Sequence, residues 1–373
     1  MHRRFIRIGT IAGAPVVLDI GWFLLVAGLL WALPRYYLEA ILPASSAVER
    51  VALALGVSLV FSGTILLHEL AHLGMASALR LRAKRITLTL FGGAVSLAED
   101  RSHAAQEFLI SLAGPGATLA LGLVFGLLHR YSVGRAPVVA AAARALQLAC
   151  IGLGLFNLFP ALPLDGGQAL RAVLWALSRD RHTAGFWAAR IGQWAGSAMT
   201  IVGLMGYLSR DANQWIWLAV VGLLVEGGAR AAYRQVGVER AIEGHVAADV
   251  MVRGCVPLSP DLTLDQLDGA LARRSVPCLV VGDERGVYGM LTGSRIRRVR
   301  RSRRGRTTLM QVLLPIAEQH RVSPEMPLRE VLERMFDSGL QELPVMRDGA
   351  MLGIAVHHEI VRLIESRSIG GLS

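Results

Sequence analysis

Residues 52–78 read ALALGVSLVFSGTILLHELAHLGMASA, an apolar stretch longer than the roughly 20 residues that a helix needs to cross a bilayer. Three ionisable side chains, His68, Glu69 and His72, interrupt it. Such side chains cost several kcal/mol in an apolar environment unless they are paired or bound to a metal. The stretch therefore predicts a membrane-spanning helix with a polar site buried inside it.

Further apolar stretches surround this one along the first part of the chain. The predicted spans cover residues 18–34, 52–78, 107–129, 137–158, 187–208 and 214–230. With 53% hydrophobic residues and a mean hydropathy of +0.46, the chain is too apolar for an ordinary soluble enzyme. The sequence predicts a polytopic α-helical membrane protein with six transmembrane helices.

The positions of the basic residues predict the orientation of these spans. Basic residues precede the first span and follow the second: Arg3, Arg4 and Arg7, then Arg80, Arg82, Lys84 and Arg85. In the loop between these spans, two arginines are matched by two glutamates: Arg35 and Arg50, with Glu39 and Glu49. Because Lys and Arg concentrate in cytoplasmic loops, we expect a multi-pass protein of the cell membrane with a cytoplasmic N-terminus. Six spans then leave the C-terminus in the cytoplasm as well.

Two short segments differ from the helical spans. Residues 86–90 alternate between apolar and polar with a period of two, and residues 5–18 are rich in β-branched side chains around Gly9 and Gly13. Both patterns favour strands, so we predict a small membrane-associated β-sheet. Irregular tethers are the alternative.

His68-Glu69-Leu70-Ala71-His72 has the spacing of a helical metal site. Residues four apart lie on one helix face, so both imidazoles can bind one metal ion. Glu69 projects at a different angle, from which it can act as a general base on a water molecule. The alternative is a buried polar cluster without a metal.

A catalytic zinc site takes three protein ligands and leaves a fourth position open. Asp165 is the best candidate for the third ligand, because it follows the fourth span in a segment that Pro160, Pro163 and the pair Gly166-Gly167 prevent from being a plain helix. A broken segment at membrane depth is tolerated where it lines a protein cavity. An ordinary turn is the alternative interpretation.

A membrane-embedded His-Glu-x-x-His helix followed by Asn157-x-x-Pro160-x-x-Pro163-Leu-Asp165-Gly-Gly resembles the site-2 protease family of intramembrane metalloproteases. The resemblance implies one zinc ion held by His68, His72 and Asp165, with water activation by Glu69. It also implies that Asn157 donates a hydrogen bond to the oxyanion of the reaction, with helix capping as the alternative role.

Two further segments match this family. Residues 85–97, which include Phe91-Gly92-Gly93-Ala94, are similar to a membrane-associated strand that pairs with an extended substrate. Residues 111–115, SLAGP, match another family segment, although Thr118 stands where an asparagine is frequent. The implied substrates are single-pass transmembrane proteins that another protease has already trimmed.

The soluble tail contains an internal repeat with a period near 60 residues. Each copy predicts a helix, a strand, a turn and a strand, followed by a further helix. The first four elements are 261–273, 278–281, 282–283 and 288–291 in the first copy, and 327–339, 343–346, 348–349 and 352–355 in the second. The tail resembles a tandem pair of cystathionine-β-synthase (CBS) domains. The predicted organisation is a protease domain at 1–235 and a cytoplasmic α+β tandem CBS domain with copies at 245–305 and 306–368.

CBS pairs of this kind often bind an adenine nucleotide and form homodimers, and both are expected here from the resemblance. An aspartate that commonly contacts the ribose is replaced by Arg295 after Thr292 and by Glu359 after Val356. A ligand-free module for dimerisation or substrate gating is therefore an equal alternative.

Eight arginines lie between the two copies, within residues 295–306. No aromatic residue interleaves with them, so we expect a solvated connection near the lipid bilayer, with direct lipid contact as the alternative, and no nucleic-acid partner. A channel or transporter regulated by CBS domains is the rival interpretation of the whole chain, because such proteins also place polar residues inside the membrane. An inactive protease homologue that binds membrane partners is the second rival.

Overall fold

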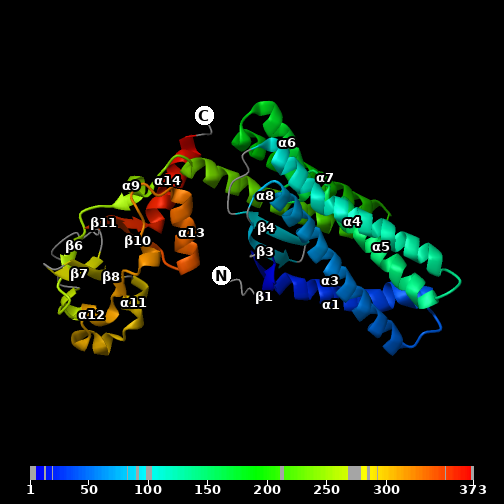
Figure 1. Ribbon diagram of the computed structural model, residues 1–373, viewed down its shortest axis with the longest axis horizontal. Helices are drawn as coiled ribbons and strands as arrows, with labels where there is room; N and C mark the ends of the chain where they lie inside the picture. The colour runs from blue at the N-terminus through cyan, green and yellow to red at the C-terminus, as the bar shows by residue number, and fades with distance from the viewer. Residues whose placement is uncertain are drawn as a thin grey trace. The chain divides into compact units, whose positions relative to one another are not determined.

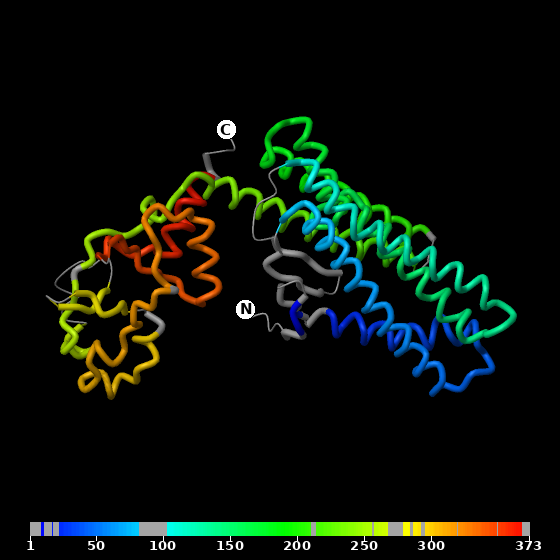
Figure 2. The backbone as a smooth tube through the Cα atoms, in the orientation of Figure 1, coloured from blue at the N-terminus to red at the C-terminus, as the bar shows by residue number. Residues whose placement is uncertain are grey.

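The computed structural model divides into two compact units, Met1–Arg234 and Gln235–Ser373. It describes residues 6–11, 14–18, 20–81, 83–89, 92–97, 103–210, 214–267, 279–283, 286–291, 293–348 and 350–370. Long helices dominate the first unit, and short strands and helices alternate in the second (Figures 1 and 2).

The central helix of the first unit is α3 (Ala47–Ala78), which contains the apolar stretch at 52–78. It begins at a capping box, in which the Ser46 hydroxyl accepts from the Glu49 amide and the Glu49 carboxylate accepts from the Ser46 amide. Its exposed side chains include Leu55, Leu59 and Leu67. Exposed leucines on a helix of this length suit contact with lipid.

Four more helices follow α3 and the small sheet along the chain. They are α4 (Ala104–Ser132), α5 (Pro137–Asn157), α6 (Asp165–Ser178) and α7 (Arg181–Arg210). Helix α4 packs against α3, α5 and α6, and α6 packs against α7. The protein interior between α3 and α5 is apolar and contains Val57, Phe61, Ile65, Leu73, Ala145 and Leu146. Helix α4 is therefore the element that connects α3 to α6.

Five helical segments of the described chain are long and apolar enough to cross a membrane: Trp22–Ile41, Ala47–Ala78, Ala104–Ser132, Pro137–Asn157 and Gln214–Ile242. The predicted span at 187–208 lies within α7, which is not among them, so the count of six is not confirmed. The first span also extends beyond the predicted end at residue 34. A π-helix (Leu33–Leu38) and the short α2 (Glu39–Ile41) continue α1 (Ile20–Ala32) past Pro34.

The predicted small sheet is present and has four strands in the order β1-β2-β3-β4. They are β1 (Ile6–Ile11), β2 (Ala14–Leu18), β3 (Ala83–Thr89) and β4 (Gly92–Leu97). Strands β2 and β3 are parallel, and both outer pairs are antiparallel. The prediction of one strand over residues 85–97 was wrong, because these residues divide between β3 and β4. Phe91 lies outside the described residues.

The second unit contains two sheets with related strand pairs. In the first copy β7 (Leu279–Asp283) pairs with β8 (Gly286–Met290), and in the second β10 (Glu342–Arg347) pairs with β11 (Ala350–Val356). Shorter strands extend both sheets: β5 (Met251–Val252), β6 (Val256–Leu258) and β9 (Leu314–Pro315). Both predicted strand pairs are thus confirmed, while Cys278, Gly349 and the end of the predicted helix 261–273 lie outside the described residues.

Helices cover these sheets and the two copies share a core. The helices of the second unit include α9 (Ala247–Val250), α11 (Gly293–Arg298), α12 (Leu309–Val312), α13 (Leu328–Ser338) and α14 (His357–Gly370). Val280 and Met290 of the first copy pack with Ile354 and Val356 of the second in one buried cluster. Packing of one copy on the other is the arrangement that the internal repeat predicts.

The arginine run is more ordered than the predicted connection. It forms α11 and then a 3₁₀ helix, Arg301–Arg306, none of whose residues is buried. A solvated connection near the lipid bilayer stays a prediction, because Nε of Arg304 is buried although no residue of the 3₁₀ helix is buried as a whole.

Candidate metal centre

The three ionisable residues in the apolar stretch of α3 lie on the buried face of the helix. Buried residues recur along it at intervals of three and four: Ala54, Val57, Ser58, Phe61, Thr64, Ile65, His68, Glu69, His72, Leu73 and Ala76. This is the spacing of one face of an α-helix. The periodicity that buries Phe61 and Ile65 therefore also turns His68 and His72 into the unit, where they are 3% and 7% exposed.

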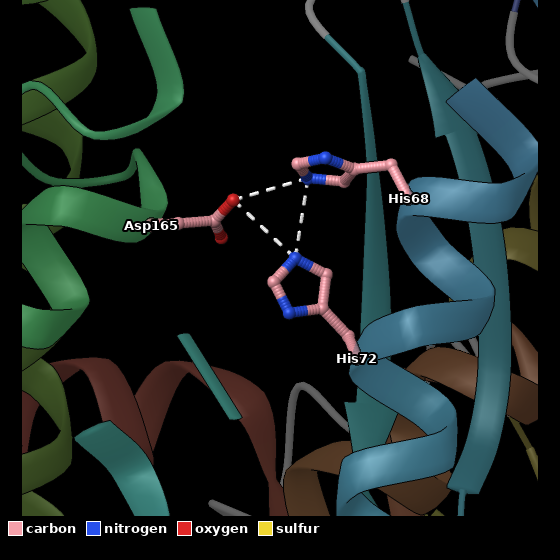
Figure 3. A group of neighbouring side chains, drawn as sticks. All are labelled: His68, His72 and Asp165. Carbon is pink, nitrogen blue, oxygen red and sulfur yellow. Dashed lines mark hydrogen bonds and ion pairs between the residues drawn. The ribbon is translucent and has the colours of Figure 1, made fainter. Parts of the chain in front are cut away.

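Asp165 completes a cluster with the two imidazoles (Figure 3). Its Oδ2 atom lies 3.1 Å from Nε2 of His68 and 3.3 Å from Nε2 of His72, and the two Nε2 atoms are 3.2 Å apart. Ligand atoms that are about 2.0–2.1 Å from a tetrahedral zinc ion lie roughly 3.3 Å from one another. The three separations therefore suit one zinc ion.

The position of Asp165 depends on the turn between α5 and α6. Asp165 is the first residue of α6, and Gly166 and Gly167 follow it. A Cβ atom on Gly166 would overlap the Leu158 carbonyl group, and one on Gly167 would overlap the backbone of Ala161. Only glycine lets the first turn of α6 approach the preceding loop this closely, and this approach holds the carboxylate toward α3.

A backbone carbonyl of α4 orients His72. Nδ1 of His72 lies 2.6 Å from the carbonyl oxygen of Ile110, which can only accept a hydrogen bond. In the neutral ring Nδ1 therefore carries the proton, and the lone pair of Nε2 points toward Asp165. Metal-binding histidines commonly use their second ring nitrogen in this way.

Gly114 of α4 lies beside the Nε2 atoms of both histidines. A Cβ atom at this position would lie 2.7 Å from Nε2 of His68 and closer still to Nε2 of His72. The absent side chain leaves room beside both imidazoles. Donor types, separations and this space all fit zinc.

Glu69 is the fourth ionisable group at the centre. It is 1% exposed, and its Oε1 atom lies 4.0 Å from Nε2 of His68. The carboxylate is too far from that nitrogen for a hydrogen bond, but it is close enough to contact a water molecule held beside the three ligands. Glu69 thus adjoins the cluster without belonging to the ligand set among the described residues.

Asn157 lies at the C-terminal end of α5, in the segment that leads to Asp165. It is 6% exposed, and its side-chain amide donates to the Leu153 carbonyl oxygen at 3.1 Å. A side-chain amide carries two N–H groups, so this bond uses only one of them.

Sequence reasoning did not identify a buried ion pair between α4 and α6. Glu107 of α4 is 0% exposed, and its Oε1 atom accepts from Nε of Arg171 of α6 at 2.5 Å. Arg181, at the start of α7, places Nε 3.9 Å from Oε2 of the same carboxylate. The sequence offered a signal for this ion pair: one glutamate at the edge of an apolar span and one arginine six residues after Asp165. The pair joins α4 to the helix that carries Asp165.

The residues that depart from the CBS pattern are engaged within the second unit. The Arg295 guanidinium donates to the carbonyl oxygen of Leu313 at 2.7 Å. Oε1 of Glu359 lies 3.1 Å from Nε2 of His358 and 3.1 Å from the guanidinium of Arg362. Thr292 lies outside the described residues.

Comparison with known families assigns both parts of the chain. Residues 56–149 match the model of peptidase family M50, and residues 246–302 and 318–366 match the CBS domain model. The first match includes His68, Glu69 and His72.

Relatives with zinc metalloprotease names align along nearly the whole chain. Rip3 of Mycobacterium tuberculosis is 30% identical over 97% of this chain and 93% of its own length, and sll0528 of Synechocystis is 27% identical over 97% and 96%. Among solved structures, the site-2 protease from Methanocaldococcus jannaschii is 27% identical, with a TM-score of 0.44 over 62% of this chain and 96% of that one. The chain is therefore a multi-pass membrane protein of peptidase family M50, the site-2 protease family, and carries a tandem pair of CBS domains.

Proposed function

We propose that this chain is an intramembrane zinc endopeptidase, which hydrolyses peptide bonds of membrane-spanning proteins. The observation that carries the proposal is the convergence of two imidazoles and a carboxylate, from helices distant in sequence, with separations of 3.1–3.3 Å inside an apolar unit. A structural polar cluster would need neither the space at Gly114 nor a further buried carboxylate beside it.

His68, His72 and Asp165 would hold one zinc ion per chain. When bound, zinc supplies Lewis acidity, which makes water nucleophilic near neutral pH and polarises a carbonyl group. Residues of the chain transfer the proton and stabilise the charge on the carbonyl oxygen.

Glu69 moves the proton. Its carboxylate accepts a proton from the attacking water, whose oxygen forms a bond to the carbonyl carbon of the scissile peptide. The carbon–nitrogen bond then breaks, and Glu69 returns the proton to the leaving amine. Asn157 uses its second amide N–H to stabilise the negative charge that develops on the carbonyl oxygen.

Single-pass transmembrane proteins are the proposed substrates. A membrane-spanning helix must unwind before a protease can reach its peptide bonds, and its freed backbone groups then need new partners. Strand β4 ends the order β1-β2-β3-β4, so its outer edge can accept an extended segment as an added strand. We place the metal centre in the cytoplasmic half of the bilayer and both termini in the cytoplasm, from the positions of the basic residues.

The test is co-expression with candidate single-pass membrane proteins, comparing the wild type with Glu69→Gln. The variant loses the general base but keeps all three ligands, so we expect zinc content near that of the wild type and no cytoplasmic fragment. Glu39→Gln is the matched control, because Glu39 is exposed and pairs only with Arg50 at 3.5 Å among the ion pairs of the described residues. Cleavage by Glu69→Gln at the wild-type rate would rule out this assignment.

The same experiment separates the rival functions. A channel or transporter predicts wild-type protein without tightly bound zinc. An inactive homologue predicts bound zinc but no cleavage of any candidate by the wild type.

The CBS pair is assigned a regulatory role, in which a bound ligand or a second copy of the chain changes access to the protease unit. Adenine nucleotide is the proposed ligand class, and dimerisation through the CBS domains is the proposed assembly. Calorimetric titration of the full chain with ATP and AMP tests the first, and the mass of the purified protein tests the second.

A further inference from the structure

One face of α4 forms the outer wall of the metal centre. Ile110, Gly114 and Thr118 are four residues apart and so lie on one side of the helix. Ile110 contacts Nδ1 of His72, and Thr118 contacts Nδ1 of His68. Gly114 lies between them and faces both Nε2 atoms. The spacing of four on α4 therefore matches the spacing of four between the two histidines of α3.

Thr118 is the member of this wall that acts through a side chain. It is 0% exposed, and its Oγ1 atom lies 2.7 Å from Nδ1 of His68 and 3.0 Å from the carbonyl oxygen of Gly114. A threonine hydroxyl has a single hydrogen to donate and two lone pairs that accept. The two contacts therefore cannot both use that hydrogen.

Hydrogen-bond accounting favours one arrangement. The Gly114 carbonyl can only accept, so the hydroxyl hydrogen goes to it, in the usual bond of a helical threonine to the carbonyl four residues earlier. Oγ1 then accepts from Nδ1–H of His68. In the neutral ring this leaves Nε2 without a hydrogen, and its lone pair points at the site shared with His72 and Asp165.

The reverse arrangement is incompatible with metal binding by His68. If the hydroxyl donated to Nδ1, the neutral ring would carry its proton on Nε2, 3.1 Å from Oδ2 of Asp165. A protonated Nε2 can bond to that carboxylate but cannot bind a metal ion. The Gly114 carbonyl therefore selects the form of His68 that the site needs.

We infer that Thr118 is a positioning residue of the metal centre: its hydroxyl relays a hydrogen bond from His68 to the Gly114 carbonyl and so holds the imidazole ready to bind metal. This inference rests on the proposed zinc site. Thr118 acts on His68 as the Ile110 carbonyl acts on His72. Loss of such an outer partner typically lowers metal affinity or activity about 10- to 100-fold.

The experiment measures the zinc affinity of the purified full chain by competition with a chelator, together with the visible spectrum after cobalt substitution. Thr118→Val keeps the shape of the side chain and removes the hydroxyl, so we expect roughly 10- to 100-fold weaker binding and an altered cobalt spectrum. Thr118→Ser keeps the hydroxyl and should bind zinc like the wild type.

Thr64→Val is the matched control. Thr64 is 3% exposed on α3, and its hydroxyl donates to the Phe61 carbonyl at 2.7 Å, so this variant also loses a buried helical threonine hydroxyl. It should keep the zinc affinity of the wild type. Equal affinities of Thr118→Val and the wild type would overturn the inference, as would loss of zinc by Thr118→Ser. A wild type that binds no zinc would instead overturn the proposed function and the inference together.

Discussion

A Cβ atom on Gly114 would stand 2.7 Å from Nε2 of His68 and closer still to Nε2 of His72. The glycine therefore keeps open the space that a metal ion shared by these residues would occupy. Its role is spatial, because it contributes no functional group to the centre.

Gly114→Ala should exclude zinc from a protein that otherwise folds. The added methyl group occupies the space between the imidazoles, whereas alanine is intrinsically better than glycine in a helix by about 1 kcal/mol. We expect metal analysis of the purified variant to show loss of most of its zinc, and the co-expression assay to show no cleavage.

Gly116→Ala is the control for this change. Gly116 lies two residues further along α4, and a Cβ atom there would meet nothing within 4 Å. This variant has the same gain in helix propensity and should keep its zinc. If Gly114→Ala retained as much zinc as Gly116→Ala, the metal could not lie where the three ligand atoms converge.

The ion pair between Glu107 and Arg171 should stabilise the position of α6. Arg171→Met removes the nearer guanidinium from a fully buried carboxylate and leaves Arg181 as a more distant ion-pair partner. Breaking a buried pair costs about 3 kcal/mol at the lower end of the usual range. We expect a lower unfolding temperature in detergent and weaker zinc binding, because α6 carries Asp165.

A double-mutant cycle distinguishes the pair from general damage. Glu107→Gln with Arg171→Met removes both charges, so its loss of stability should be smaller than the sum of the two single losses. Arg230→Met is the surface control: Arg230 pairs with Glu226 at 2.5 Å but its side chain is 64% exposed. Such pairs contribute about 1 kcal/mol or less. Additive effects at Glu107 and Arg171 would contradict the prediction.

Glu342, the first residue of β10, should make the second unit less stable as the pH rises. Desolvation by burial raises the pKa of its carboxyl group, and the nearby charge of His358 opposes this in part. A pKa that is higher in the folded state than in the unfolded state means that the folded state binds the proton more tightly. Its stabilising contribution is present below the unfolded pKa and is lost as the pH rises through the folded pKa.

Glu342→Gln removes this titration. The variant should protect the amides of β10 and β11 from hydrogen exchange better than the wild type at pH 7, and the difference should disappear near pH 4, below which the glutamate is protonated in both states. Glu365→Gln, at an exposed position of α14, should give no gain at either pH. A gain of equal size at both pH values would show that the charge of Glu342 is not its cause.

The sequence alone determined what depends on periodicity and on local chemistry. The apolar stretch at 52–78 predicted α3 because a span needs a certain length, and the four-residue spacing of His68 and His72 predicted their common face because an α-helix has a fixed repeat. The internal repeat likewise predicted the strand pairs of the second unit. The predicted span at 187–208 is a helix, α7, but its length and composition do not place it with the five clearest spans.

The tertiary structure decided what depends on contacts between distant segments. Asp165 is 97 residues from His68, and only the packing of α3, α4 and α6 sets the 3.1 Å between them. The partners of the histidines are a backbone carbonyl, a missing side chain and one hydroxyl, at Ile110, Gly114 and Thr118. The family resemblance pointed to the segment that contains Gly114 and to Thr118, but not to what these residues contact. Any residue has a carbonyl, and the role of each group emerges only when α4 is packed against α3.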